Sequence, residues 1–141
     1  MTTNGDASIL IELDGDGGLQ WPGSILSGRY RLAVSHPDEV RAVELSILWY
    51  TIGQGEEDMA VHYFQRRQMD EVIRPGEPPL DLCAGERFET RLPNSPLSYD
   101  GVVVKVRWCV RVRAFLARGK DLVAEREFRL GDVPSAQLVA T

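Results

Sequence analysis

The sequence predicts an all-β protein built as an antiparallel β-sandwich. Apolar and polar residues alternate with a period of two in segment after segment, which places successive side chains on opposite faces of a strand. Clusters of Gly, Pro and Asp separate these segments and are typical of the turns between strands. The length of 141 residues suits one domain with its own core. We expect the sandwich to span 9–130, after a flexible N-terminus over 1–8 and before a C-terminal tail over 131–141.

Short alternating segments predict most of the strands. In the segment 43–49, one face carries Val43, Leu45, Ile47 and Trp49, opposite Glu44 and Ser46. The same pattern predicts strands over 9–13, 29–34, 43–49, 88–92 and 121–130. Trp49 is expected on a buried face, whereas Trp21, beside Pro22, is expected to be more exposed.

The clearest strand is predicted over 102–113. Its even positions are Val or Trp, including Trp108, and its odd positions are mostly Lys or Arg, with Cys109 among them. A helix would point such residues in every direction, so the pattern requires a strand with one buried face. The alternation can be followed to Leu116. A strand of that length has to bend, bulge or extend beyond its neighbours.

The last two strands are predicted to form a hairpin around a three-residue turn at 118–120. Because Val110 and Phe128 should face the same core, paired residue numbers must add to an even value. The turn then places Arg113 opposite Glu125 and Arg111 opposite Glu127. Such cross-strand charge pairs contribute about 0.2–1 kcal/mol each.

The segment 56–73 allows two interpretations. Its acidic start would suit the first turn of a helix, yet Val61 and Tyr63 alternate with His62 and Phe64. We favour a strand over 59–66, followed by a loop over 74–79.

Two turn-like motifs resemble ligand-binding loops without completing them. Asp14-Gly15-Asp16-Gly17-Gly18 begins like a calcium loop, but Leu19 and Ile25 stand where Gly and Glu are required. A hairpin turn is therefore favoured. The motif over 53–58 lacks the Lys and Ser/Thr of a phosphate loop, and its carboxylates would repel phosphate, so an exposed strand connection is favoured.

Composition limits the classes of function. The net charge of −5 argues against general nucleic-acid binding. No apolar run approaches the length of a membrane span, and the first residues lack the pattern of a signal peptide. Two cysteines cannot form a disulfide framework. These observations predict a cytoplasmic protein without membrane insertion.

Two stretches resemble the arrestin family. Pro22-Gly23-Ser24-Ile25-Leu26-Ser27-Gly28-Arg29-Tyr30-Arg31-Leu32 is similar to the entry of arrestins into their second strand. Pro93-Asn94-Ser95-Pro96-Leu97-Ser98-Tyr99-Asp100-Gly101, which leads into the strand with Trp108, resembles the arrestin Pro/Ser turn before an aromatic-bearing strand. The resemblance covers about 9–130 and implies a single arrestin-like, immunoglobulin-like domain, akin to bacterial sporulation-control proteins. Arrestins have two such domains in tandem, and this chain has room for one.

The resemblance implies a non-catalytic scaffold or adaptor that binds another protein. Strand addition at sheet edges, or contact through end loops, is the expected mode, and a homo-oligomer is an open possibility. His36, His62, Cys83 and Cys109 lack metal-ligand spacing. Neither a catalytic residue nor a cofactor is therefore predicted. His36 is expected at the surface, His62 half-buried and both thiols inert.

One row of residues could contribute to partner binding: Lys105, Arg107, Arg111 and Arg113. It could meet phosphates or an acidic partner, but Glu125 and Glu127 on the neighbouring strand would neutralise half of it. A self-paired outer sheet face is therefore favoured. The alternative function is a small-ligand-binding or metal-dependent enzyme subunit with a pocket at one end of the sandwich, which a deep hollow with convergent polar groups would favour.

Overall fold

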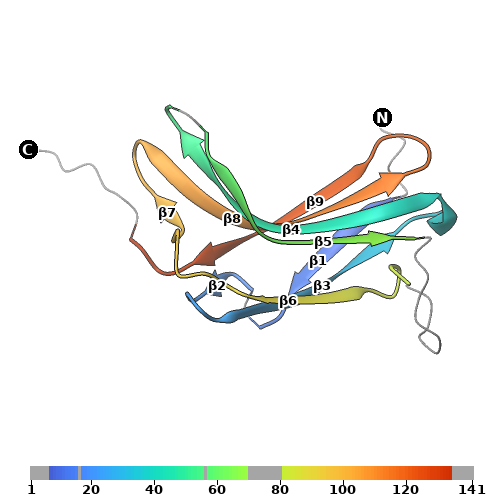
Figure 1. Cartoon of the computed structure of the whole chain (residues 1–141), viewed down its shortest axis with the longest axis horizontal. Helices are drawn as coiled ribbons and strands as arrows, with labels where there is room; N and C mark the ends of the chain where they lie inside the picture. The colour runs from blue at the N-terminus through green and yellow to red at the C-terminus, as the bar shows by residue number, and fades with distance from the viewer. Residues whose placement is uncertain (1–6, 16, 56, 70–80, 135–141) are drawn as a thin grey trace, which may run out of the picture.

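Two β-sheets pack face to face in the computed structural model, which describes residues 7–15, 17–55, 57–69 and 81–134. The smaller sheet is antiparallel in the order β1-β3-β6. Its strands are β1 (Ser8–Leu13), β3 (Ile25–Ala33) and β6 (Glu86–Arg91). In Figure 1 this sheet forms the lower layer.

The larger sheet has the order β2-β9-β8-β4-β5, with β7 also paired to β8. All its pairings are antiparallel except that of β2 with β9. Its strands are β2 (Leu19–Gln20), β4 (Val40–Gly53), β5 (Met59–Gln68), β7 (Tyr99–Asp100), β8 (Val104–Leu116) and β9 (Leu122–Leu130). A 3₁₀ turn over Pro37–Glu39 precedes β4. Within the described part of the chain, no helix has the length and hydropathy needed to span a membrane.

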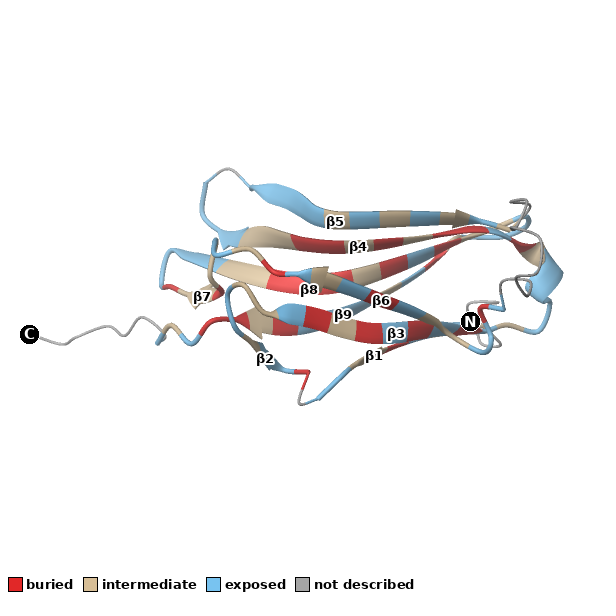
Figure 2. Cartoon of the chain, turned by 60° about the horizontal axis from the view of Figure 1, so that its bottom comes forward, coloured by how far each residue is buried: buried red, intermediate tan, exposed pale blue. Residues whose placement is uncertain are grey.

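The core lies between the sheets and is centred on Trp108 of β8, whose side chain is fully buried. The Trp108 indole packs against Phe128 of β9 with a centroid separation of 5.9 Å, and its Nε1–H donates to the carbonyl of Pro96 at 2.7 Å. Val110 and Val112 continue the buried face, and β3 contributes alternate residues from the other side. Figure 2 shows this alternation as red bands along β3 and β4. The predicted all-β sandwich is confirmed.

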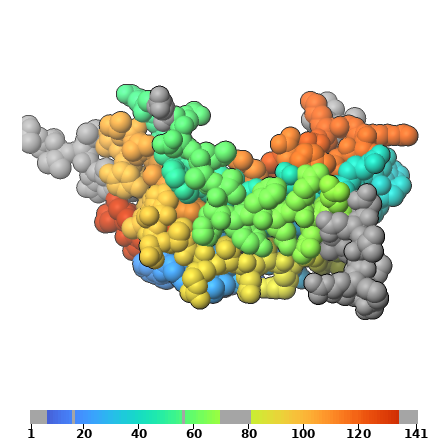
Figure 3. Space-filling model, in the orientation of Figure 1, coloured from blue at the N-terminus to red at the C-terminus, as the bar shows by residue number. Residues whose placement is uncertain are grey.

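The outer face of the larger sheet is hollowed. The strands curve along their length, so that both ends of β4 and β8 rise above the middle (Figure 1), and Figure 3 shows the resulting saddle at the top of the molecule. Leu48 and Cys109, which pair across β4 and β8, point away from the core. They are nevertheless only 1% and 2% exposed, because neighbouring outer-face side chains cover the bottom of the hollow.

Most strand predictions are confirmed. The segment 59–66 lies within β5 and is not a helix. The prediction for 102–113 is wrong at its start, because β8 begins at Val104 and both Val102 and Val103 are exposed. These residues form the turn between β7 and β8, where no opposing sheet covers them. The loop expected over 74–79 and much of the expected termini, 1–6 and 135–141, lie outside the described residues.

Two connection predictions are wrong. The β8–β9 loop spans five residues, so Arg111 lies opposite Glu125 and Arg113 opposite Val123. This register differs by two residues from the predicted one, and both keep the same side chains inward. The motif at 14–18 is not a hairpin turn, because it connects β1 in one sheet to β2 in the other.

Candidate binding surface

The exposed side of β5 is the candidate binding surface. Among the described strands, β5 pairs with β4 alone and forms one end of the larger sheet. Met69 N–H, just after the strand, donates to the carbonyl of Arg41 at 3.0 Å. Because main-chain groups alternate in direction along a strand, the N–H and C=O of Phe64 and Arg66 point away from β4.

The first half of β5 follows the same rule on the other side of a β-bulge. The bulge lies opposite Ile47 and Leu48 of β4. Before it, Thr51 N–H donates to the carbonyl of Asp58 at 2.9 Å, so the main-chain groups of Met59 and Val61 also point away from β4. β5 therefore presents an open edge along both halves.

Large apolar side chains accompany this edge. Met59, Val61 and Phe64 project to the outer face and are 59%, 49% and 53% exposed. Ile52 of β4 extends the same apolar surface towards the β4–β5 turn. Figure 2 shows β5 largely exposed beside the buried bands of β4, and Figure 3 shows it on the near side of the molecule. Exposed apolar surface of this kind is typical of interaction sites.

The inner side of β5 is tied to β6 of the other sheet. The Nε2 atom of His62 lies 2.8 Å from the carbonyl oxygen of Arg91, and its ring meets Trp108 edge-on with centroids 6.1 Å apart. Arg67 forms an ion pair with Glu86 at 3.3 Å. These contacts position the edge. His62 is exposed rather than half-buried as predicted, because its polar contact lies at the gap between the two sheet edges.

The predicted row on β8 lies on the same outer face, and most of it is ion-paired. Arg111 Nε lies 2.6 Å from Glu125 Oε2, and Arg113 Nη2 lies 3.1 Å from Asp121 Oδ2. Lys105 is exposed near the β4–β5 turn. The favoured self-paired face is therefore observed, and a role of this row in partner binding stays a prediction.

Arginine also stacks on an aromatic ring at the far end of this face. The guanidinium carbons of Arg66 and Arg113 lie 5.2 and 5.1 Å from the centroid of the Phe115 ring. Arg66 Nη1 additionally lies 2.5 Å from Glu44 Oε2. This end of β5 thus combines positive charge with aromatic surface.

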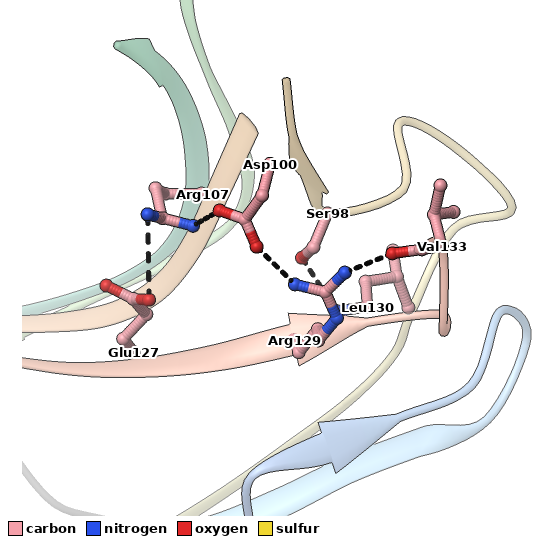
Figure 4. A network of polar contacts seen from close by, with 7 residues as sticks. All are labelled: Ser98, Asp100, Arg107, Glu127, Arg129, Leu130 and Val133. Carbon is pink, nitrogen blue, oxygen red and sulfur yellow. Dashed lines mark hydrogen bonds and ion pairs between the residues drawn. The ribbon is translucent and has the colours of Figure 1, made fainter. Parts of the chain in front are cut away.

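A second polar feature ties β7, β8 and β9 together near the C-terminal end of the sandwich (Figure 4). Asp100 accepts hydrogen bonds from Arg107 and, at 2.9 Å, from Arg129. Arg107 also lies 3.7 Å from Glu127, and Arg129 donates to the carbonyl of Val133. The Arg107 hydrogen bond, followed by that of Arg129, holds the pKa of the Asp100 carboxyl below its usual range.

Buried titratable groups are held neutral. Burial, followed by the negative charge of Glu125, raises the pKa of the Cys109 thiol to about 12, which agrees with the inert thiol that was predicted. Burial also raises the pKa of Tyr30, on the inner face of β3. Cys83 is exposed.

Hollows elsewhere are shallow or small. One hollow has a volume of about 630 Å³ and lies beside β1 and the end of β3, where Leu10, Val34 and Cys83 line it and Arg31 is the charged residue among its described lining. A hollow of about 280 Å³ adjoins the Asp100 cluster. In the ranges that the structure describes, no group of three or more His, Cys, Asp or Glu side chains could hold a metal ion.

Known structures resemble this chain in fold. No family model and no curated protein sequence match it. The sporulation control protein Spo0M from Bacillus subtilis superposes with a TM-score of 0.59 and 17% identity, over 92% of this chain and 51% of Spo0M. The superoxide reductase neelaredoxin from Ignicoccus hospitalis superposes with a TM-score of 0.50 and 15% identity, over 88% of this chain and 80% of its own.

These comparisons show a shared β-sandwich fold, and the likeness to Spo0M supports the predicted arrestin-like form of it. The chain spans about half the length of Spo0M. At such low identity the likeness shows the fold and carries no site residues. The β5 edge was not singled out from the sequence. The sequence signal that could have indicated it is the presence of apolar residues on both faces of 59–64. A strand inside a sheet with one solvent-exposed face needs apolar residues on its buried face only.

Proposed function

We propose that this chain is a non-catalytic protein-binding module that takes an extended segment of a protein onto the open edge of β5. The observation that carries the proposal is a ten-residue edge strand with outward main-chain groups and three half-exposed apolar side chains. Strand addition uses the main chain for affinity and alternate side chains for specificity.

The composition of β5 supports this function. Natural edge strands are protected by proline, by shortness, by β-bulges or by inward-pointing charges. β5 contains no proline and is ten residues long, and its protective features are the bulge and the inward-pointing Arg67. Its two basic residues stand together at one end, at Arg66 and Arg67, which leaves Met59 to Phe64 without a charged side chain. An incoming strand would therefore bury apolar surface over most of its length.

The fold supports a regulatory module. Spo0M, which shares the fold, is described as a sporulation control protein. A binding role in regulation is consistent with that description.

Peptide selection tests the proposal. Random 12-residue peptides displayed on phage are selected against the dilute, immobilised chain. Amide hydrogen exchange of the chain is then measured with and without each selected peptide. We expect the amides of Phe64 and Arg66 to become protected, because they point away from β4.

Two substitutions at one position separate main-chain from side-chain binding. Phe64→Pro removes the outward N–H without removing a hydrogen bond to β4, so we expect peptide affinity to fall at least about tenfold. The matched control Phe64→Ala keeps the N–H and loses only the ring, so the fall should be smaller. Equal affinities for the two variants, without protection of Phe64 and Arg66, would contradict strand addition.

A further inference from the structure

We infer that a second copy of this chain is the strand that adds to β5, with Phe64 opposite Arg66 of the partner subunit. This inference rests on the proposed function and assigns a partner and a register to the second half of the same edge, around 63–67. The resulting dimer would join the two larger sheets into one continuous sheet around a two-fold axis at Gln65.

The sequence of β5 is self-complementary when it is read antiparallel to itself. Residues 63–67 read Tyr-Phe-Gln-Arg-Arg. A two-fold axis at Gln65 sets Phe64 opposite the partner's Arg66 and Tyr63 opposite the partner's Arg67. Both aromatic residues then meet arginine, and no two like charges are opposed.

Main-chain direction selects this register. An antiparallel hydrogen-bonded pair requires that both residues point their N–H and C=O into the interface. Phe64 and Arg66 both point away from β4, whereas Gln65 points towards it. The register therefore allows four hydrogen bonds, two in each of the pairs between Phe64 and the partner's Arg66.

Neighbouring registers are less favourable. A shift that sets Arg66 opposite the partner's Arg66 opposes two positive charges. The shift in the other direction sets Phe64 opposite the partner's Phe64, and Arg66 then meets the partner's His62, which lies at the bulge and turns its ring inward to Arg91 and Trp108.

Arg66 is already placed for contact with an aromatic ring. Its guanidinium lies over Phe115 of its own chain and reaches Glu44, on the same outer face to which Phe64 projects. The partner's Phe64 would add a second ring beside it. Because the contact is short, it belongs with the smaller protein interfaces, and we expect a Kd on the order of 10–100 μM.

Paired charge substitutions at Phe64 test the dimer. Sedimentation velocity of the full chain is measured over roughly 1–500 μM, a range that brackets the affinity of a small interface. We expect the wild type to change from monomer to dimer. Phe64→Arg should remain monomeric because it opposes the partner's Arg66, whereas Phe64→Glu should dimerise at least as well as the wild type.

Cross-linking tests the register. In a Cys83→Ser background, Gln65→Cys sets two thiols opposite each other in a non-hydrogen-bonded pair, where Cα atoms lie about 4.5 Å apart and a disulfide can form. Mild oxidation should give a covalent dimer. Phe64→Cys in the same background is the control and should not cross-link, because its opposite residue is Arg66 of the partner subunit.

The outcomes distinguish this inference from the proposed function. A wild type that stays monomeric while selected peptides protect Phe64 and Arg66 would overturn self-pairing and leave strand addition standing. A dimer that Phe64→Arg does not weaken would overturn the β5 interface. If the wild type is monomeric and no peptide protects the edge, both proposals fail.

Discussion

Trp108 is the residue on which most of the core depends. It is fully buried, packs against Phe128 and donates its indole N–H to Pro96. Its neighbours in sequence, Arg107 and Cys109, face the opposite side of the sheet. One position thus joins the hydrophobic core to the turn that precedes β7.

Replacement of Trp108 by Phe should destabilise the fold substantially. The smaller ring leaves unfilled volume and the Pro96 carbonyl loses its donor, so we expect the free energy of unfolding to fall by about 3 kcal/mol. Urea unfolding followed by circular dichroism measures this change. Trp21→Phe is the control and should change stability by less than about 0.5 kcal/mol, because Trp21 is exposed.

Asp100 should make stability depend on pH. Its pKa is lowered in the folded state, so it stabilises the fold above the unfolded-state pKa, and this contribution is lost as pH falls through the folded-state pKa. We expect Asp100→Asn to lower the Tm at pH 7 and to approach the wild type in strong acid. Thermal unfolding at several pH values tests this, with Asp132→Asn, an exposed position in the loop after β9, as control. A Tm difference that does not change with pH would contradict it.

At the level of single strands, β3 is the central strand of the smaller sheet and depends on a close approach at Gly28. A Cβ at this position would lie 2.2 Å from the carbonyl oxygen of Glu12 and 3.0 Å from the Phe88 ring. Glu12 belongs to β1 and Phe88 to β6. A side chain at Gly28 would therefore force β1 and β3 apart.

We expect Gly28→Ala to cost about 2 kcal/mol of unfolding free energy. Native-state hydrogen exchange should show the loss most strongly in β1, because the clash is with its backbone. Ala33→Val adds atoms at an exposed end of the same strand and is the matched control. Uniform loss of protection across both sheets would indicate a different cause.

Prediction from sequence succeeded for strands and failed where long-range pairing decides. The alternation in β8 reports burial directly, because Trp108, Val110 and Val112 must face the core. The register of the β8–β9 hairpin could not be read in the same way, since a slip of two residues leaves every side chain on the same face. The prediction of a strand at Val102 was wrong because three successive valines resemble a strand whether or not a sheet lies opposite.

Across the whole molecule, the binding surface could not be located from sequence. Whether β5 ends a sheet depends on which strands pair with β4, and no local pattern contains that information. The Asp100 cluster joins residues from three separate segments, so its charges become neighbours only in the folded chain. The row from Lys105 to Arg113 could be recognised from the sequence. The ion pairs of that row with Asp100 and Asp121 could not be recognised from it.

The two ends of the larger sheet differ in a way that limits growth. Among the described strands, β5 has a neighbour on one side only, whereas at the opposite end β9 is bordered by the short parallel strand β2 and by β1 of the other sheet. Sheets with an unpaired edge at both ends can join edge to edge into fibres. A larger sheet with one unpaired edge can bind one partner strand, and no second edge is then left for further growth. This architecture therefore favours a closed dimer over a filament.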